Sequence, residues 1–72
     1  MVFSDRIEKI CQEHNRIKAC KEECERDYDK LIFEAEEQTI NYCLGTLGIS
    51  CVRSNGYITA FDYLGGFREV AS

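Results

Sequence analysis

The 72-residue sequence has no proline and no tryptophan, and its first 44 residues contain no glycine either. Proline and glycine are the strongest helix breakers, so neither interrupts the chain before Gly45. All five glycines fall between Gly45 and Gly66. This division predicts a single α+β domain over residues 1–72: one long amphipathic helix at about residues 4–44, followed by a small antiparallel β-hairpin or three-strand meander at residues 49–71.

Long apolar runs are also missing. The longest uncharged stretch, Gln38 to Val52, is shorter than the roughly 20 apolar residues that a membrane-spanning helix needs. The segment Met1 to Ile10 lacks the basic region and apolar core of a secretory signal, and five cysteines are an odd count for a disulfide framework. We therefore expect a cytoplasmic protein with reduced thiols and no membrane partner.

The charge balance excludes a further class. The net charge is -4, whereas binding to phosphates requires a basic surface, so we expect no direct nucleic-acid partner. A chain this short buries only about 60% of its unfolded surface and is marginally stable alone. Small folds gain stability from disulfides, a metal or oligomerisation. Association with another chain is therefore expected.

The two ends of the long helix have ordinary signals. Ser4 is a suitable N-cap, and Asp5 and Glu8 would lie in the first turn, where carboxylates favour the positive helix end. Gly45 would be the left-handed residue after the last turn. Such a helix would be about 60 Å long. Its weakest point is Cys24 to Asp29, which contains several poor helix formers, and a break into a hairpin would occur there.

Apolar side chains recur along this helix with a seven-residue period. One set comprises Phe3, Ile10, Ile17, Cys24 and Leu31, and the interleaved set comprises Ile7, His14, Lys21, Tyr28, Ala35 and Tyr42. This spacing is typical of a coiled-coil seam and predicts a homodimer. The residues expected in the dimer interface are Ile7, Ile10, His14, Ile17, Cys24, Tyr28, Leu31 and Ala35. The alternative is an ordinary amphipathic helix that packs on its own sheet.

The order of charges favours an antiparallel pair. Met1 to Lys21 contains five Lys or Arg residues and three acidic ones, whereas Glu22 to Glu37 contains eight acidic residues and two basic ones. An antiparallel dimer would place each basic half against an acidic half. The acidic side chains are also the expected partner-binding stripe. They are Glu22, Glu23, Glu25, Asp27, Asp29, Glu34, Glu36 and Glu37.

The C-terminal third has the composition of β-structure. Ile49 to Arg53 and Tyr57 to Leu64 flank Asn55-Gly56, a dipeptide favoured in type I′ hairpins. Gly65-Gly66 can form a second turn into Phe67 to Val70. A second apolar helix face, made of Phe33, Ile40 and Leu44, is expected to receive this segment.

Metal and catalytic chemistry find little support in the sequence. Cys11, His14, Cys20 and Cys24 are suitable zinc ligands by type, but on one straight helix the first two point about 130° away from the other two. The only histidine has no nucleophile fixed beside it. We therefore expect no metal site, no cofactor and no catalytic residues.

The sequence favours a small non-enzymatic protein-binding regulator, adaptor or inhibitor that acts as a homodimer. Its binding surfaces would be the acidic stripe and the aromatic tail, which comprises Tyr57, Phe61, Tyr63 and Phe67. In one specific version, the stripe occupies the basic groove of a nucleic-acid-handling protein. Two alternatives are a zinc- or thiol-based sensor that uses Cys11, His14, Cys20 and Cys24, and a structural subunit of a larger assembly.

Overall fold

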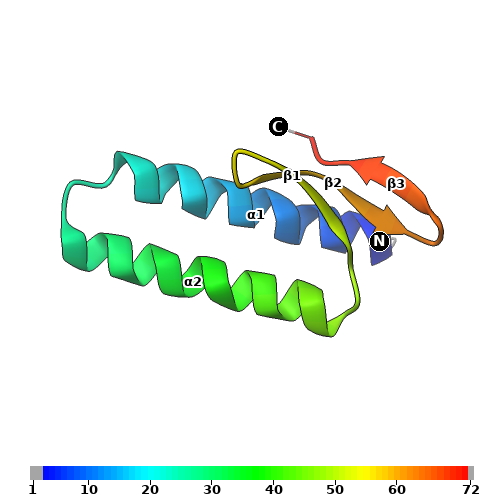
Figure 1. The fold of residues 1–72 in the computed structure, drawn as a ribbon, viewed down its shortest axis with the longest axis horizontal. Helices are drawn as coiled ribbons and strands as arrows, with labels where there is room; N and C mark the ends of the chain where they lie inside the picture. Colours follow the sequence, from blue (N-terminus) through cyan, green and yellow to red (C-terminus); the bar gives the residue numbers. More distant parts are fainter. Residues whose placement is uncertain (1–2, 72) are drawn as a thin grey trace.

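The computed structural model describes residues 3–71 and confirms the α+β class. Its elements are α1 (Phe3–Glu23), α2 (Asp27–Thr46), β1 (Cys51–Ser54), β2 (Tyr57–Tyr63) and β3 (Gly66–Glu69). The helices form an antiparallel hairpin, and the sheet packs along α1 (Figure 1), with contacts that run from Ser4 to Glu22. The molecule measures 40 × 22 × 22 Å. Among the described residues, no helix is long and apolar enough to cross a lipid bilayer.

The prediction of one continuous helix over residues 4–44 is wrong. The helix ends at Glu23 and resumes at Asp27, because Arg26 has an extended backbone with φ -87° and ψ 129°. The break lies at the start of the segment of poor helix formers, and Asp27 and Asp29 then occupy the first turn of α2, where acidic residues stabilise a helix. Folding back brings α2 against α1, which buries apolar surface that a straight helix would leave in water.

The helix ends also differ from the predicted ones. Ser4 is not an N-cap, because it lies inside α1, which begins at Phe3. At the other end, Gly48 rather than Gly45 has the left-handed conformation, with φ 73°. The Gly48 N–H donates to the carbonyl of Gly45 and the Ile49 N–H to that of Leu44, both at 3.0 Å. This is the Schellman pattern, and it ends α2 at Thr46.

The predicted β-meander is confirmed, with strand order β1-β2-β3 and antiparallel pairing throughout. Asn55 and Gly56 connect β1 to β2 with φ 53° and 85°, as a type I′ turn requires. The second turn is one residue earlier than predicted, at Leu64-Gly65, and Gly66 already pairs with Tyr63.

The core lies at one end of the molecule, where all the layers meet. Ile7 and Cys11 from α1 pack with Leu44 from α2 and with Ile58 and Phe61 from β2, and all five are buried. The free end of the helical hairpin extends past the sheet (Figure 1). There α1 and α2 cover only each other's inner faces.

Candidate functional site

The N-terminal half of the predicted seam lies inside the chain's own fold. Ile7, His14 and Ile17 are buried, and Ile10 packs against the core cluster from its edge. The sheet and α2 provide this burial, since α1 contacts both α2 and β2. For this half of the seam, the alternative of a helix packed on its own sheet describes the structure.

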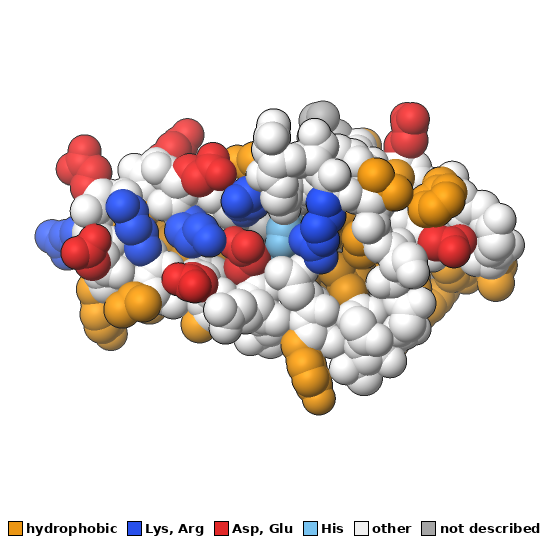
Figure 2. Space-filling model, in the orientation of Figure 1, with side chains coloured by type: hydrophobic (Ala, Val, Ile, Leu, Met, Phe, Trp, Pro, Cys, Tyr) orange, Lys and Arg blue, Asp and Glu red, His pale blue; other side chains and the backbone are white. Residues whose placement is uncertain are grey.

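The C-terminal half of the seam is exposed. Tyr28, Leu31 and Tyr42 are 73%, 64% and 76% exposed, and Ala35 is exposed beside them. Hydrophobic side chains project along the edge of the molecule formed by α2 (Figure 2). We call this uncharged face the α2 ridge. It comprises Tyr28, Leu31, Ile32, Ala35, Gln38, Thr39 and Tyr42. Cys24, also predicted for the interface, is half-buried in the connection between the helices.

Helix geometry explains why the ridge stays exposed. Tyr42 lies two residues before the buried Leu44, which places the two side chains about 200° apart around α2. The ridge therefore faces away from α1 and from the sheet. Thr39 donates its hydroxyl to the carbonyl of Ala35 at 2.9 Å, so its polar group is paired within the helix. An uncharged helix face of this extent is typical of a surface that another protein covers.

The acidic residues occupy several different environments. Glu37 is only 18% exposed and lies 3.2 Å from the ammonium of Lys21. Glu22 accepts a hydrogen bond from the Tyr57 hydroxyl at 2.8 Å, which lowers the pKa of Glu22. Asp29 is half-buried. The remaining exposed acidic residues form what we call the acidic flank: Glu23, Glu25, Asp27, Glu34 and Glu36.

The antiparallel charge pairing predicted between two copies is made within one chain. The hairpin lays the basic α1 alongside the acidic α2, and Lys21 of α1 pairs with Glu37 of α2. Acidic and basic side chains consequently alternate over the hairpin (Figure 2). The overall charge order therefore explains the hairpin, and it no longer argues for a second copy.

His14 is the buried member of a polar cluster between the helices and the sheet. Its side chain is 0% exposed, with Nδ1 3.1 Å from Asn15 Oδ1 and Nε2 3.5 Å from Arg53 Nη1. Glu37 Oε1 lies 3.9 Å from Nε2. Arg53 also donates to Asn41 at 2.7 Å. The cluster joins α1, α2 and β1, and it gives the only histidine a structural environment.

The cysteines are free thiols in different surroundings. Cys11 is fully buried, and this burial, with smaller contributions from neighbouring Cys51 and from Glu8, raises its pKa to about 12. A thiol with this pKa is a poor metal ligand and nucleophile at neutral pH. Cys20 and Cys24 are half-buried and Cys43 is exposed. Within residues 3–71, no three His, Cys, Asp or Glu residues are placed to hold a metal ion.

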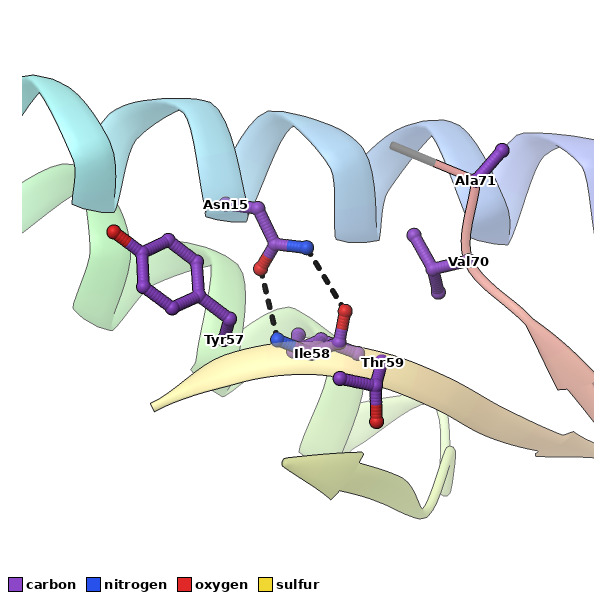
Figure 3. A pocket seen from close by; sticks show the side chains of 6 residues that line it. All are labelled: Asn15, Tyr57, Ile58, Thr59, Val70 and Ala71. Carbon is purple, nitrogen blue, oxygen red and sulfur yellow. Dashed lines mark hydrogen bonds between the residues drawn. The ribbon is translucent and has the colours of Figure 1, made fainter. Parts of the chain in front are cut away.

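A pocket of about 340 Å³ lies where α1 meets β2 and the chain end (Figure 3). Asn15 points into it, but its amide donates to the Ile58 carbonyl and accepts from the Ile58 N–H, both at 2.8 Å. The other lining residues are Tyr57, Ile58, Thr59, Val70 and Ala71. They include no carboxylate, histidine or cation. Asn15 therefore holds β2 on α1.

Two structural residues were missed by the sequence reasoning. Asn15 is one, and Arg68 is the other: from β3 it donates to Ser4 Oγ at 2.6 Å and to Glu8 Oε1 at 3.0 Å, and it also pairs with Asp5. The contacts with Asp5 and with Glu8 raise the pKa of Arg68. A lone Asn or Arg gives no spacing signal, because the partner residues are more than 40 positions away.

Comparisons with protein-family models, with curated proteins and with solved structures found no match to this chain.

Proposed function

We propose that the chain is a small cytosolic, non-enzymatic protein that acts as a homodimer and binds another protein, as a regulator, adaptor or inhibitor. The observation that carries this proposal is the α2 ridge, with Tyr28, Leu31 and Tyr42 each more than 60% exposed on one uncharged helix face. Water is an unfavourable neighbour for such a face, and a protein partner is a favourable one.

The total accessible surface is that of an elongated chain. The chain exposes 5029 Å², whereas a compact monomer of 8.3 kDa is expected to expose about 4,600 Å². The difference of roughly a tenth reflects the elongated hairpin. Burial of the ridge against another chain would remove apolar surface that the sheet does not reach.

The placement of the reactive side chains favours binding over catalysis. His14 is buried and surrounded by Asn15, Arg53 and Glu37. Cys11 has a raised pKa, and the amide of Asn15 is fully engaged with Ile58. A general base or nucleophile needs access to a substrate, and these groups are used in packing instead.

The acidic flank is the proposed surface for the second protein. Its members are exposed, and they surround the ridge without belonging to it. A partner with a basic surface would be attracted to this flank, and the attraction would weaken as salt screens the charges. A nucleic-acid-handling protein with a basic groove has this chemistry.

Affinity capture from cells that make the protein tests this proposal. Glu36→Lys reverses one charge of the acidic flank, and Glu69→Lys makes the same change on exposed β3 as a control. We expect the wild type and Glu69→Lys to retain the same basic protein at low salt, and Glu36→Lys to retain several-fold less. High salt should release it. If the wild type and Glu36→Lys retain the same proteins in the same amounts, the proposed partner binding is wrong.

A further inference from the structure

The α2 ridge has a spacing that matches itself in reverse. Its outward residues follow one another at steps of three and four positions, in the order Tyr28, Leu31, Ala35, Gln38 and Tyr42, and Gly45 continues the same period. If a second helix is turned end over end about a point between Ala35 and Gln38, each of these positions meets another position of the same set. Leu31 then lies opposite Tyr42 of the second copy, and Tyr28 lies opposite Gly45. Side chains at this spacing can interdigitate between two paired helices.

The charges of α2 favour the same orientation. Residues 27–37 of α2 carry Asp27, Asp29, Lys30, Glu34, Glu36 and Glu37. Residues 38–46 carry no charge at all. An antiparallel pair places each acidic half against an uncharged half, whereas a parallel pair brings the two acidic halves together. The helix dipoles are also opposed in the antiparallel pair, which is favourable.

One flank of the ridge provides a further complementary contact. In the antiparallel arrangement, Glu34 lies beside Asn41 of the second copy. Asn41 accepts a hydrogen bond from exposed Arg53 at 2.7 Å. The carboxylate of Glu34 would therefore approach a side of the second copy that carries a cation, which stabilises the pair.

We propose that the α2 ridge binds the α2 ridge of a second copy, with the helices antiparallel and the two-fold axis between Ala35 and Gln38. This inference rests on the proposed homodimer and specifies its interface. The contact is isologous, so each residue pair occurs twice. Glu34 lies at the edge of this contact, and the other residues of the acidic flank stay on the outside of the dimer, which presents two equivalent surfaces to the basic partner.

Disulfide cross-linking in a variant that lacks the accessible native cysteines tests the geometry. The half-buried and exposed native thiols are first removed as Cys20→Ser, Cys24→Ser, Cys43→Ser and Cys51→Ala, and light scattering establishes whether this background is a dimer. Leu31→Cys and Tyr42→Cys are then introduced into separate chains. Each sample is oxidised with oxidised glutathione, either alone or as an equimolar mixture of the two chains.

The antiparallel arrangement predicts disulfide-linked dimers in the mixture only. Leu31 of one copy faces Tyr42 of the other, whereas the two Leu31 positions are about 16 Å apart along the axis, which is too far for a disulfide. In a parallel dimer formed through the same ridge, identical positions would face each other, so each variant alone would form disulfide-linked dimers.

The outcomes separate this inference from the proposed function. Self-cross-linking of Leu31→Cys overturns the antiparallel geometry and leaves the dimer standing. A dimer by light scattering that cross-links in no sample overturns the ridge as the interface. A background protein that is monomeric at every concentration overturns the proposed dimer itself, while the salt-sensitive capture through Glu36 can still succeed.

Discussion

Single polar residues hold the sheet on the helical hairpin. Asn15 binds both backbone groups of Ile58, and Arg68 binds the first turns of α1. These contacts join positions more than 40 residues apart. The sheet would otherwise be attached to α1 mainly by the small apolar cluster around Phe61. The orientation of β2 on α1 therefore depends on few side chains.

Asn15→Ala is expected to lower the free energy of unfolding by about 1–3 kcal/mol, because it leaves the Ile58 N–H and carbonyl without their partners. Asn15→Asp keeps the acceptor for the N–H but loses the donor to the carbonyl, so it should destabilise as well. Urea denaturation measures both, with Lys9→Ala on the exposed side of α1 as the control. Equal stability of Asn15→Ala and the control would contradict this role.

Cys11 should make stability depend on pH in the alkaline range. Its pKa is raised from 9.0 to about 12 by burial, so the unfolded chain loses the thiol proton before the folded chain does. The contribution of the protonated Cys11 thiol to the free energy of unfolding is complete below pH 9 and is lost as pH rises toward 12.

The expected slope is at most about 1.4 kcal/mol per pH unit. Chemical denaturation of the wild type and of Cys11→Ala at several pH values isolates it, because the variant lacks this group. Parallel pH profiles for the two proteins would show that Cys11 is not responsible.

At the scale of elements, the sequence predicted the β-meander closely because its turns have specific chemistry. Asn55-Gly56 requires positive φ at both positions, and few residue pairs tolerate that. The break between α1 and α2 has no such signal, since neither glycine nor proline occurs there. Local propensity placed the weak point correctly, but tertiary packing of α2 against α1 decides that the helix breaks.

The predicted coiled-coil seam also shows that a local pattern does not determine tertiary packing. Heptad spacing marked an apolar face correctly in both halves, yet the spacing does not say what covers it. Ile7 and Ile17 are covered by the chain itself, while Tyr28 and Leu31 are exposed. The polar contacts of Asn15 and Arg68 depend on the final fold, so no sequence pattern could have identified them.

Two glycines at the end of α2 should respond in opposite ways to the same substitution. A Cβ on Gly45 or Gly48 would meet open space, but only Gly48 has positive φ, at 73°. Gly48→Ala is therefore expected to destabilise by about 1–2 kcal/mol. Gly45→Ala lies within the helix and should stabilise by about 0.5–1 kcal/mol. Thermal unfolding measures both variants, and a stabilising Gly48→Ala would contradict the assigned helix end.

At the scale of the whole molecule, the fold divides into a packed end and an open end. The sheet buries apolar residues in the first half of α1. Basic side chains of α1 pair with acidic side chains of α2 within the same chain, as Lys21 does with Glu37. The α2 ridge starts at the open end and runs along the outer face of α2 to Tyr42, and the acidic flank lies on the open half of the hairpin. This division separates what stabilises the monomer from what is proposed to bind partners, so changes to the ridge should alter association with little effect on folding.

Sedimentation equilibrium of the reduced protein over a range of concentrations tests the central claim, that the α2 ridge covers itself with a second copy. The wild type should reach the dimer mass. Leu31→Glu should weaken association about tenfold or more, and Phe67→Glu, at a 69% exposed apolar site on β3, should leave it unchanged. A monomer at every concentration, or a dimer that Phe67→Glu dissociates and Leu31→Glu does not, would contradict the account.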